Sequence, residues 1–241
     1  MELSGRSILV TGGSSGIGRA VAVAYANEGA TVWVVARRRG PLEQTLAMGP
    51  PGMIRPVVAD LTDLAGRATV ANTLASQTGA LDVAVHAAGL LGPPGVPLET
   101  YPANAWYEVF EANVSAVHFL HQELAGLLHR SKRPTVIGVS STVGKKGRAG
   151  WGMYAVSKFA LEGWLETLAD EWAHTGRVYA VNPGGTRTPM RAEAMPGEDP
   201  DSLPAPADIV PIFLRLAHAE CAEPSGSRFE AREWIGRDPW R

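Results

Sequence analysis

A cluster of glycines separates a short apolar run from a helical pattern near the N-terminus. The segment reads SILVTGGSSGIGRA, residues 7–20. Gly12, Gly16 and Gly18 let the backbone turn tightly and lie close to a ligand. The helix that follows offers free N–H groups and a partial positive charge, both of which favour a phosphate. This loop, placed between a strand and a helix, predicts a dinucleotide-binding α/β fold; a glycine-rich turn without a ligand is the alternative.

Short apolar runs alternate with helical patterns along the rest of the chain. These runs lack the polar/apolar alternation of half-exposed strands, so we expect a parallel sheet that is covered on both faces. Pro56 cannot donate to a sheet ladder, which places its strand at an edge. The predicted strands are 7–12, 31–36, 54–60, 81–87, 135–140, 177–182 and 227–231.

The expected fold is therefore a single-domain, Rossmann-like, doubly wound α/β sheet spanning 1–241, with strand order 3-2-1-4-5-6-7 and right-handed crossovers. The segment 187–208 is rich in proline and charge and follows the sixth predicted strand. A long irregular insertion in a compact domain is usually functional. We expect it to form a substrate lid.

The composition excludes several classes of partner. The 241 residues carry a formal net charge of −2 without a recurring basic stripe, which argues against nucleic acid. The N-terminus resembles neither a signal peptide nor a membrane span. A single cysteine, Cys221, fits a reducing compartment. His118 and His121 share a helical face but lack a third ligand, so no metal is expected. These features predict a cytoplasmic protein.

Three consecutive arginines follow the apolar run TVWVVA at 31–36. In dinucleotide folds an acidic residue near this point holds the ribose 2′-hydroxyl, whereas an arginine accommodates a 2′-phosphate. Ala36 has no charge that would repel a phosphate, and guanidinium groups pair well with phosphate oxygens. We therefore predict NADP(H) in preference to NAD(H), with Arg37 as the principal contact and Arg38 assisting. Arg39 is expected to be solvated.

Tyr154 and Lys158 lie four positions apart on a helical pattern and project from one face. A free tyrosine, with a pKa near 10, is a poor acid–base catalyst at neutral pH. A cation about 4 Å away contributes roughly 4 kcal/mol at an effective dielectric near 20, enough to lower the tyrosine pKa by up to ~3 units. The pair predicts an activated tyrosine. An ordinary buried tyrosine beside a lysine is the alternative.

These motifs resemble those of the short-chain dehydrogenase/reductase family. The spacing T-G-x-x-x-G-x-G at 11–18 and the Y-x-x-x-K pair are joined by Ser141, thirteen positions before Tyr154, and by Asn113 in EANVSAVHF. The resemblance implies that Tyr154 exchanges a proton with a substrate oxygen that Ser141 also binds. It implies further that Lys158 binds the nicotinamide ribose and that Asn113 supports a water chain to it. Ser140 remains the alternative serine.

The same resemblance implies further cofactor contacts. The segment VNPGGTRTPM resembles the turn that closes over the nicotinamide, and Asp60 resembles the aspartate that binds the adenine amine. A helix N-cap is the alternative for Asp60. The predicted cofactor contacts are Gly12, Ser14, Ser15, Gly16, Ile17, Gly18, Arg37, Arg38, Asp60, Leu61, Ala87, Ala88, Gly89, Tyr154, Lys158, Pro183, Gly184, Thr186 and Thr188.

Two segments depart from the family pattern. HAAG at 86–89 stands where the family usually reads N-N-A-G, and no D-G-G follows the last predicted strand. Ala87 removes an amide side chain, which puts the rigidity of that loop in doubt. Within the family, HAAGLLG, SSTVGKKGRAGWG, NPGGTRT and PADIVPIFLRL look most like the YciK-type bacterial oxidoreductases.

The resemblance implies an NADP(H)-dependent oxidoreductase that interconverts a small-molecule ketone or aldehyde and an alcohol. A non-catalytic NADP(H)-binding sensor or scaffold is the alternative. Family members pair through the helices predicted at 103–130 and 152–174, which implies a homodimer or homotetramer. Core burial is the alternative explanation of their aromatic residues, which are Trp106, Phe110, Trp164 and Trp172. The basic loop between Ser141 and Tyr154 is predicted at the substrate mouth and contains Lys145, Lys146 and Arg148. A solvated loop is favoured over the recruitment of an anionic substrate.

Overall fold

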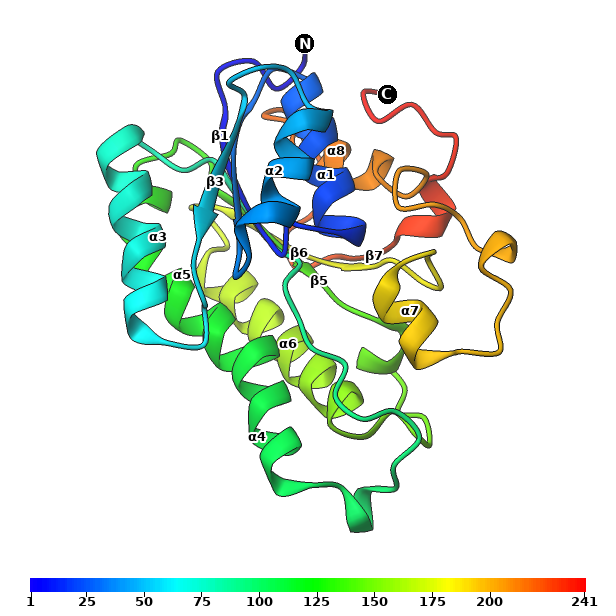
Figure 1. The fold of residues 1–241 in the computed structure, drawn as a ribbon. Helices are drawn as coiled ribbons and strands as arrows, with labels where there is room; N and C mark the ends of the chain where they lie inside the picture. Colours follow the sequence, from blue (N-terminus) through cyan, green and yellow to red (C-terminus); the bar gives the residue numbers. More distant parts are fainter.

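The computed structural model describes residues 1–241 and contains one seven-stranded parallel sheet (Figure 1). The strand order, β3-β2-β1-β4-β5-β6-β7, is the predicted one, so the Rossmann-like fold class is confirmed. Each strand falls within its predicted range. The strands are β1 Ser7–Thr11, β2 Thr31–Ala36, β3 Ile54–Val58, β4 Val83–His86, β5 Thr135–Val139, β6 Arg177–Asn182 and β7 Arg228–Glu230.

Helices cover both faces of the sheet: α1, α2 and α8 pack on one side, and α3, α5 and α6 on the other (Figure 1). The helices are α1 Gly16–Asn27, α2 Arg39–Met48, α3 Leu64–Gln77, α4 Ala103–Phe110, α5 Ala116–Leu128, α6 Gly152–Glu171, α7 Pro189–Ala194 and α8 Pro211–Ala217. A π-helical segment, Glu111–Ser115, joins α4 to α5. Short 3₁₀ turns occupy Leu98–Thr100, Thr142–Gly144, Pro200–Ser202 and Ala231–Trp234. None of these helices combines the length and the apolar character needed to cross a membrane.

Successive residues of the strands enter two separate cores. In β2, Val32 and Val34 pack with α1, whereas Trp33 and Val35 pack toward α3. Side chains alternate across a strand, so a sheet with helices on both faces needs apolar residues at every position. This double coverage explains why the strand sequences show no alternation.

The third strand lies at the edge of the sheet, as Pro56 predicts. Pro56 pairs with Val34 of β2, and no strand lies beyond β3. Val58 in the same strand is exposed. The missing proline N–H thus faces the side where no ladder bond is needed.

The aromatic residues on α4 and α6 have different environments. Trp106 and Phe110 are partly exposed, but Trp172 is buried in the core formed with α3 and α5. Trp164 is half-buried and donates from Nε1 to His118 Nδ1 at 3.2 Å. Core burial is therefore the correct explanation for Trp172, whose side chain is not available for subunit pairing.

The segment 187–208 is more regular than its composition suggests. It contains α7 and a 3₁₀ turn. Arg191 forms an ion pair with Glu198 at 2.5 Å, and Arg187 forms one with Asp201 at 2.6 Å. Pro189 begins α7, where its fixed φ suits the first helical turn. The segment is thus an ordered flap beside the carboxyl ends of the strands.

His86 ends β4 in a dry environment. Neither of its ring nitrogens has a hydrogen-bond partner, and its ring lies edge-on to Trp164 at 6.3 Å. Burial, together with the nearby His121, lowers the pKa of His86 to about 3. The folded protein therefore holds this imidazole neutral at neutral pH.

We expect His86 to make the protein sensitive to acid. The unfolded imidazole has a pKa near ~6.5. Stability from the neutral ring is therefore complete above that pH and falls by about 1.4 kcal/mol per pH unit as the pH drops toward 3. His86→Asn should remove this slope from urea unfolding measured between pH ~6 and ~4. The exposed His174→Asn should leave the slope unchanged. Equal slopes in wild type and His86→Asn would contradict this assignment.

Candidate functional site

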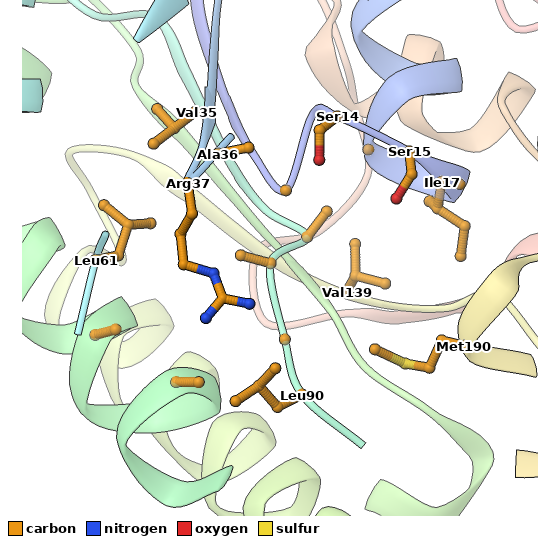
Figure 2. Close-up of a pocket in the computed structure, with 18 of the residues that line it drawn as sticks. Ser14, Ser15, Ile17, Val35, Ala36, Arg37, Leu61, Leu90, Val139 and Met190 are labelled. Atoms are coloured by element: carbon orange, nitrogen blue, oxygen red, sulfur yellow. The ribbon is translucent and has the colours of Figure 1, made fainter. Parts of the chain in front are cut away.

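A cavity of about 370 Å³ opens at the carboxyl ends of the central strands (Figure 2). Ligands of open α/β sheets bind at this edge, where the strand order reverses. The cavity passes from Arg37 and Asp60, along the glycine loop, to Tyr154 and Lys158. The predicted cofactor residues in its wall are Gly12, Ser14, Ser15, Gly16, Ile17, Gly18, Arg37, Arg38, Asp60, Leu61, Ala87, Ala88, Gly89, Tyr154, Lys158, Pro183 and Thr188.

The glycine loop brings backbone N–H groups to this wall. Gly12 has a φ of +69°, and a Cβ there would lie 2.8 Å from the backbone of Ala88. Ser15 occupies the N-cap of α1, but its side chain makes no capping hydrogen bond. The first turn of α1 also contains no acidic residue. The N–H donors of this turn are therefore available to an anion, which fits the phosphates of a dinucleotide.

Arg19 stabilises the glycine loop through hydrogen bonds, a role that the sequence analysis did not predict. Its guanidinium donates to the carbonyl oxygen of Ser14 and, at 3.3 Å, to that of Pro41. Thr45 accepts from Arg19 Nε at 3.1 Å and donates to the Gly13 carbonyl at 2.9 Å. These bonds tie the loop to α2. Only the position of Arg19 in the first turn of α1 hinted at such a role.

The three arginines differ in their surroundings. Arg37 extends from the end of β2 into the cavity, toward Leu90 (Figure 2). Arg38 also lines the cavity, and neither residue forms an ion pair. Arg39 points elsewhere and pairs with Glu43 at 2.9 Å on the exposed surface of α2. The structure thus leaves two guanidinium groups free at the cavity, and Arg39 is the solvated one.

Asp60 lies at the cavity wall and is not a helix cap. The N-cap of α3 is Asp63, which accepts from the Gly66 N–H at 2.5 Å. Asp60 Oδ1 instead accepts from the N–H and the hydroxyl of Thr62, at 3.0 and 2.8 Å. Partial burial raises the pKa of Asp60, but these bonds and Arg37 outweigh it and hold the pKa below its usual value. The carboxylate is therefore charged and oriented.

The loop that reads HAAG is anchored despite the missing amide. The buried hydroxyl oxygen of Thr11 accepts from the N–H groups of Ala87 and Ala88, both at 3.1 Å. These bonds fix the backbone that packs directly against Gly12. The loss of rigidity that Ala87 suggested is therefore offset by Thr11.

Tyr154 and Lys158 lie at the other end of the cavity, on α6. Both side chains are buried, and Lys158 Nζ is 5.5 Å from the centroid of the Tyr154 ring. Lys158 Nζ donates to the carbonyl oxygen of Val139 at 2.8 Å. The Ser141 side chain is within hydrogen-bonding reach of Tyr154. Ser141 itself follows β5 and is not part of the cavity wall.

The predicted activation of Tyr154 by Lys158 is wrong for this structure. Burial raises the pKa of Tyr154 to about 12, and Ser141 offsets this only in part. Burial also lowers the pKa of Lys158 to about 8, against the opposing effect of Glu162. The sequence estimate assumed an ammonium close to the phenol oxygen. Desolvation of the phenol dominates instead and keeps it protonated at neutral pH.

The two serines differ in their contacts: Ser140 lines the cavity, whereas Ser141 does not. The Ser140 hydroxyl is buried and donates to a carboxylate oxygen of Glu162, away from Tyr154. The Ser141 hydroxyl oxygen accepts from the Val143 N–H at 3.4 Å and lies beside Tyr154. Ser141 is thus the serine that faces the phenol.

Asn113 lies in the π-helical segment, behind the cavity wall. Its Oδ1 accepts from the Leu90 N–H at 2.7 Å, and its Nδ2 donates to the Leu90 carbonyl and to Ser157 Oγ, both at 2.9 Å. A Cβ on Gly89 would lie 3.0 Å from Asn113 Oδ1 and 3.9 Å from Lys158 Nζ. Asn113 and Lys158 therefore meet at Gly89.

Two predicted cofactor contacts lie outside the cavity. Gly184 and Thr186 are absent from its wall, and the buried Thr186 hydroxyl donates to the Pro183 carbonyl at 3.1 Å. The turn is folded on itself, so these residues support Pro183 instead of lining the cavity. Thr188 lines it and caps α7 by accepting from the Arg191 N–H at 3.1 Å. The wall also contains residues that the sequence analysis missed, among them Thr62, Ala112, Val139 and Met190.

A second cavity, of about 200 Å³, lies near the loop before α6. Its wall contains Leu91, Trp151 and Met195 together with the exposed Arg148. Trp151 also lies 5.8 Å from Tyr154, ring to ring. Lys145 and Lys146 are exposed on the same loop but do not line this cavity. Of the basic loop residues, only Arg148 lines this cavity.

This combination of cavity, glycine loop and Ser-Tyr-Lys cluster corresponds to a known family of enzymes. The family model for short chain dehydrogenases matches residues 6–199. The chain belongs to the short-chain dehydrogenase/reductase family. The predicted family is therefore confirmed, and with it the oxidoreductase class.

Several relatives of this short-chain dehydrogenase/reductase extend over almost the whole chain. The uncharacterized oxidoreductase YciK of Escherichia coli is 40% identical over 98% of this chain and 95% of its own. A short chain dehydrogenase of Escherichia coli complexed with NADPH has a TM-score of 0.91 at 40% identity, covering 96% of this chain and 98% of that one. One from Shigella flexneri complexed with NADP has a TM-score of 0.90 at 40% identity, with the same coverage. The predicted YciK-type resemblance is confirmed.

Proposed function

We propose that this protein is an NADP(H)-dependent oxidoreductase that reduces a ketone or aldehyde to an alcohol and catalyses the reverse reaction. The observation that carries the proposal is the shared cavity. Free arginines and the glycine loop line one part of it, while Tyr154 and Lys158 line the other. A dinucleotide bound in this cavity would be held by the glycine loop at its phosphates and would bring its nicotinamide to Tyr154.

In the proposed reaction, Tyr154 is the proton donor for the substrate oxygen. A phenol held protonated at neutral pH is the form that can protonate a carbonyl as it becomes an alkoxide. Ser141 hydrogen-bonds the same oxygen and orients it. When bound, the nicotinamide supplies the hydride. Lys158 binds the nicotinamide ribose, while Asn113 holds Leu90 and supports a water chain to Lys158.

The preference for NADP(H) rests on Arg37 and Arg38. Both are free of ion pairs at the cavity wall, and related short chain dehydrogenases have been crystallised with NADP or NADPH. We expect Asp60 to bind the adenine amine, and Ser14 and Ser15 to add hydroxyl donors to the phosphate; all three line the cavity. A charged guanidinium suits a 2′-phosphate better than the 2′-hydroxyl of NADH.

Arg37→Ala should weaken NADPH binding and leave NADH binding unchanged. A charge-assisted hydrogen bond contributes about 1.5–3 kcal/mol, which corresponds to roughly 10- to 100-fold in affinity. Titration of each nucleotide against tryptophan fluorescence measures both affinities. Arg39→Ala is the matched control, since Arg39 pairs with Glu43 outside the cavity. Equal affinities of the wild type for NADPH and NADH would refute the cofactor preference.

The reaction itself is tested with the purified protein, NADPH and a panel of aliphatic and aromatic aldehydes, ketones and 3-oxo esters. We expect loss of NADPH absorbance with at least one of these carbonyl classes. Formation of the corresponding alcohol identifies the reaction. Tight NADPH binding without turnover of any panel member would instead favour the sensor or scaffold function.

We also propose that α7 and the rest of 187–208 form a lid over the substrate. Met190 already contributes to the cavity wall, and closure of such a segment excludes water from the reaction.

We propose further that the protein is a cytoplasmic homodimer or homotetramer. The buried, unpaired Cys221 supports the cytoplasmic location. Exposed aromatic side chains on α4, α5 and α6 support the pairing of subunits. These aromatic residues are Trp106, Tyr107, Phe110, Phe119 and Phe159.

A further inference from the structure

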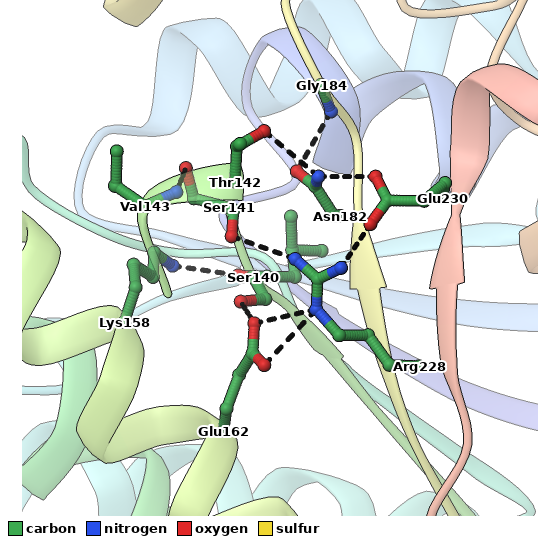
Figure 3. A network of polar contacts seen from close by, with 11 residues as sticks. Ser140, Ser141, Thr142, Val143, Lys158, Glu162, Asn182, Gly184, Arg228 and Glu230 are labelled. Carbon is green, nitrogen blue, oxygen red and sulfur yellow. Dashed lines mark hydrogen bonds and ion pairs between the residues drawn. The ribbon is translucent and has the colours of Figure 1, made fainter. Parts of the chain in front are cut away.

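An arginine of the last strand reaches the loop that carries the catalytic serine (Figure 3). Arg228 of β7 donates from Nη2 to the carbonyl oxygen of Ser141 at 3.1 Å. The two residues are 87 positions apart in the sequence. Arg228 itself does not line the cavity.

Arg228 is held between two carboxylates. Its Nε donates to both oxygens of Glu162, at 3.1 and 3.2 Å, and its Nη1 donates to Glu230. The Glu162 side chain is 11% exposed and that of Arg228 19%, so the pair is largely screened from water. A buried guanidinium with several fixed donors holds its plane in one orientation. The Nη2 group that contacts Ser141 is therefore fixed in position.

The two carboxylates extend the network to both sides. Glu162 lies one helical turn after Lys158 on α6 and accepts from the Ser140 hydroxyl. Glu230 accepts from Asn182 Nδ2 at 2.5 Å, and Asn182 Nδ2 also donates to the Thr142 hydroxyl at 3.0 Å.

On its other side, Asn182 reaches the turn that follows β6. Its Oδ1 accepts from the Gly184 N–H at 3.1 Å. The network therefore links α6, the loop after β5 and the turn after β6 (Figure 3).

We propose that Arg228 is a positioning residue, which holds the Ser141 loop and the Pro183–Gly184 turn in register with α6. The inference rests on the proposed function, because Ser141, Tyr154 and Pro183 must face one another across the reacting atoms. A misplacement of about 1 Å in such a site can cost on the order of 100-fold in rate. Without Arg228, the charge of Glu162 would be left buried and unpaired, and the loop carbonyl would lose its donor.

The test compares Arg228→Met with Arg215→Met. Arg215 of α8 forms a similarly buried pair with Glu223 at 3.3 Å, remote from this network, and is the matched control. For Arg228→Met we expect faster amide hydrogen exchange in the peptides covering 140–145 and 182–186. We also expect kcat for carbonyl reduction to fall by roughly 100-fold while the Kd for NADPH changes little. Arg215→Met should alter neither measurement.

Glu230→Gln is a milder variant that keeps the fold accessible if Arg228→Met does not fold. It removes a carboxylate that accepts from both Asn182 Nδ2 and Arg228 Nη1, while Arg228 keeps its bonds to Glu162 and Ser141. Exchange should therefore rise more at 182–186 than at 140–145. The proposal is overturned if exchange at both segments stays as in wild type, if it rises equally throughout the chain, or if kcat is unchanged. The exchange measurement needs no substrate. A failure of the proposed reaction therefore appears as absent turnover in wild type, while the exchange result still decides whether Arg228 orders these segments.

Discussion

Tyr154→Phe is expected to abolish carbonyl reduction while NADPH still binds. The side chain packs in a small apolar cluster with Leu91, Val143 and Ala155, so phenylalanine keeps its contacts and loses only the hydroxyl. General acid catalysis by a positioned side chain contributes about 10²- to 10⁴-fold in rate. Steady-state turnover should fall by this factor, with the melting temperature and the Kd for NADPH near their wild-type values.

The control for this variant is Tyr107→Phe. Tyr107 is 72% exposed on α4, and removal of its hydroxyl should change none of the three measurements. Full turnover by Tyr154→Phe would reject the tyrosine as the acid and favour a proton delivered by water. Loss of NADPH binding together with turnover would mean that the phenol serves the cofactor and not the substrate.

Gly18→Ala is expected to impair both stability and cofactor binding. A Cβ on Gly18 would lie 2.5 Å from the carbonyl oxygen of Gly12 and 2.8 Å from its carbonyl carbon, distances that backbone atoms must move to relieve. Overpacking of this kind costs about 1–3 kcal/mol. If the distortion falls on the phosphate-binding loop, NADPH should bind roughly 10- to 100-fold more weakly.

Gly163→Ala provides the contrast for this second variant. Gly163 lies on the exposed side of α6, and a Cβ there meets nothing within 4 Å. Alanine should stabilise the helix by about 0.5–1 kcal/mol because glycine is a poor helix former. Urea unfolding and NADPH titration of both variants test the comparison. Similar effects of the two substitutions would show that the contact between Gly18 and Gly12 does not matter.

The sequence predicted the sheet well because local signals determine it. Each predicted strand contains the observed one, and Pro56 correctly identified the edge strand. The glycine loop, Arg37 and Asp60 lie at strand ends, so the topology alone brings them to one cavity. The locations of residues at strand ends were therefore predictable from the fold alone.

The environments of individual side chains were less predictable. The direction of the Tyr154 pKa depends on burial, which the four-residue spacing to Lys158 does not report. The position of Thr186 in the sequence matches a cofactor contact of the family, but its hydroxyl donates to the Pro183 carbonyl. Arg228 meets Glu162 across 66 positions, and no local pattern announces such a contact. Side-chain rotamers and contacts between distant residues can be identified only once the packed structure is known.

Arg228 belongs to the last strand, so it is synthesised after the rest of the reaction centre. The residues that line the cavity all precede position 191, whereas Arg228, which donates to the Ser141 carbonyl, belongs to β7. On the ribosome, the complete sequence of the reaction centre therefore emerges well before the strand that holds it in register. The nascent chain would carry an intact but loose active site. Catalytic competence would arrive only when β7 joins β6.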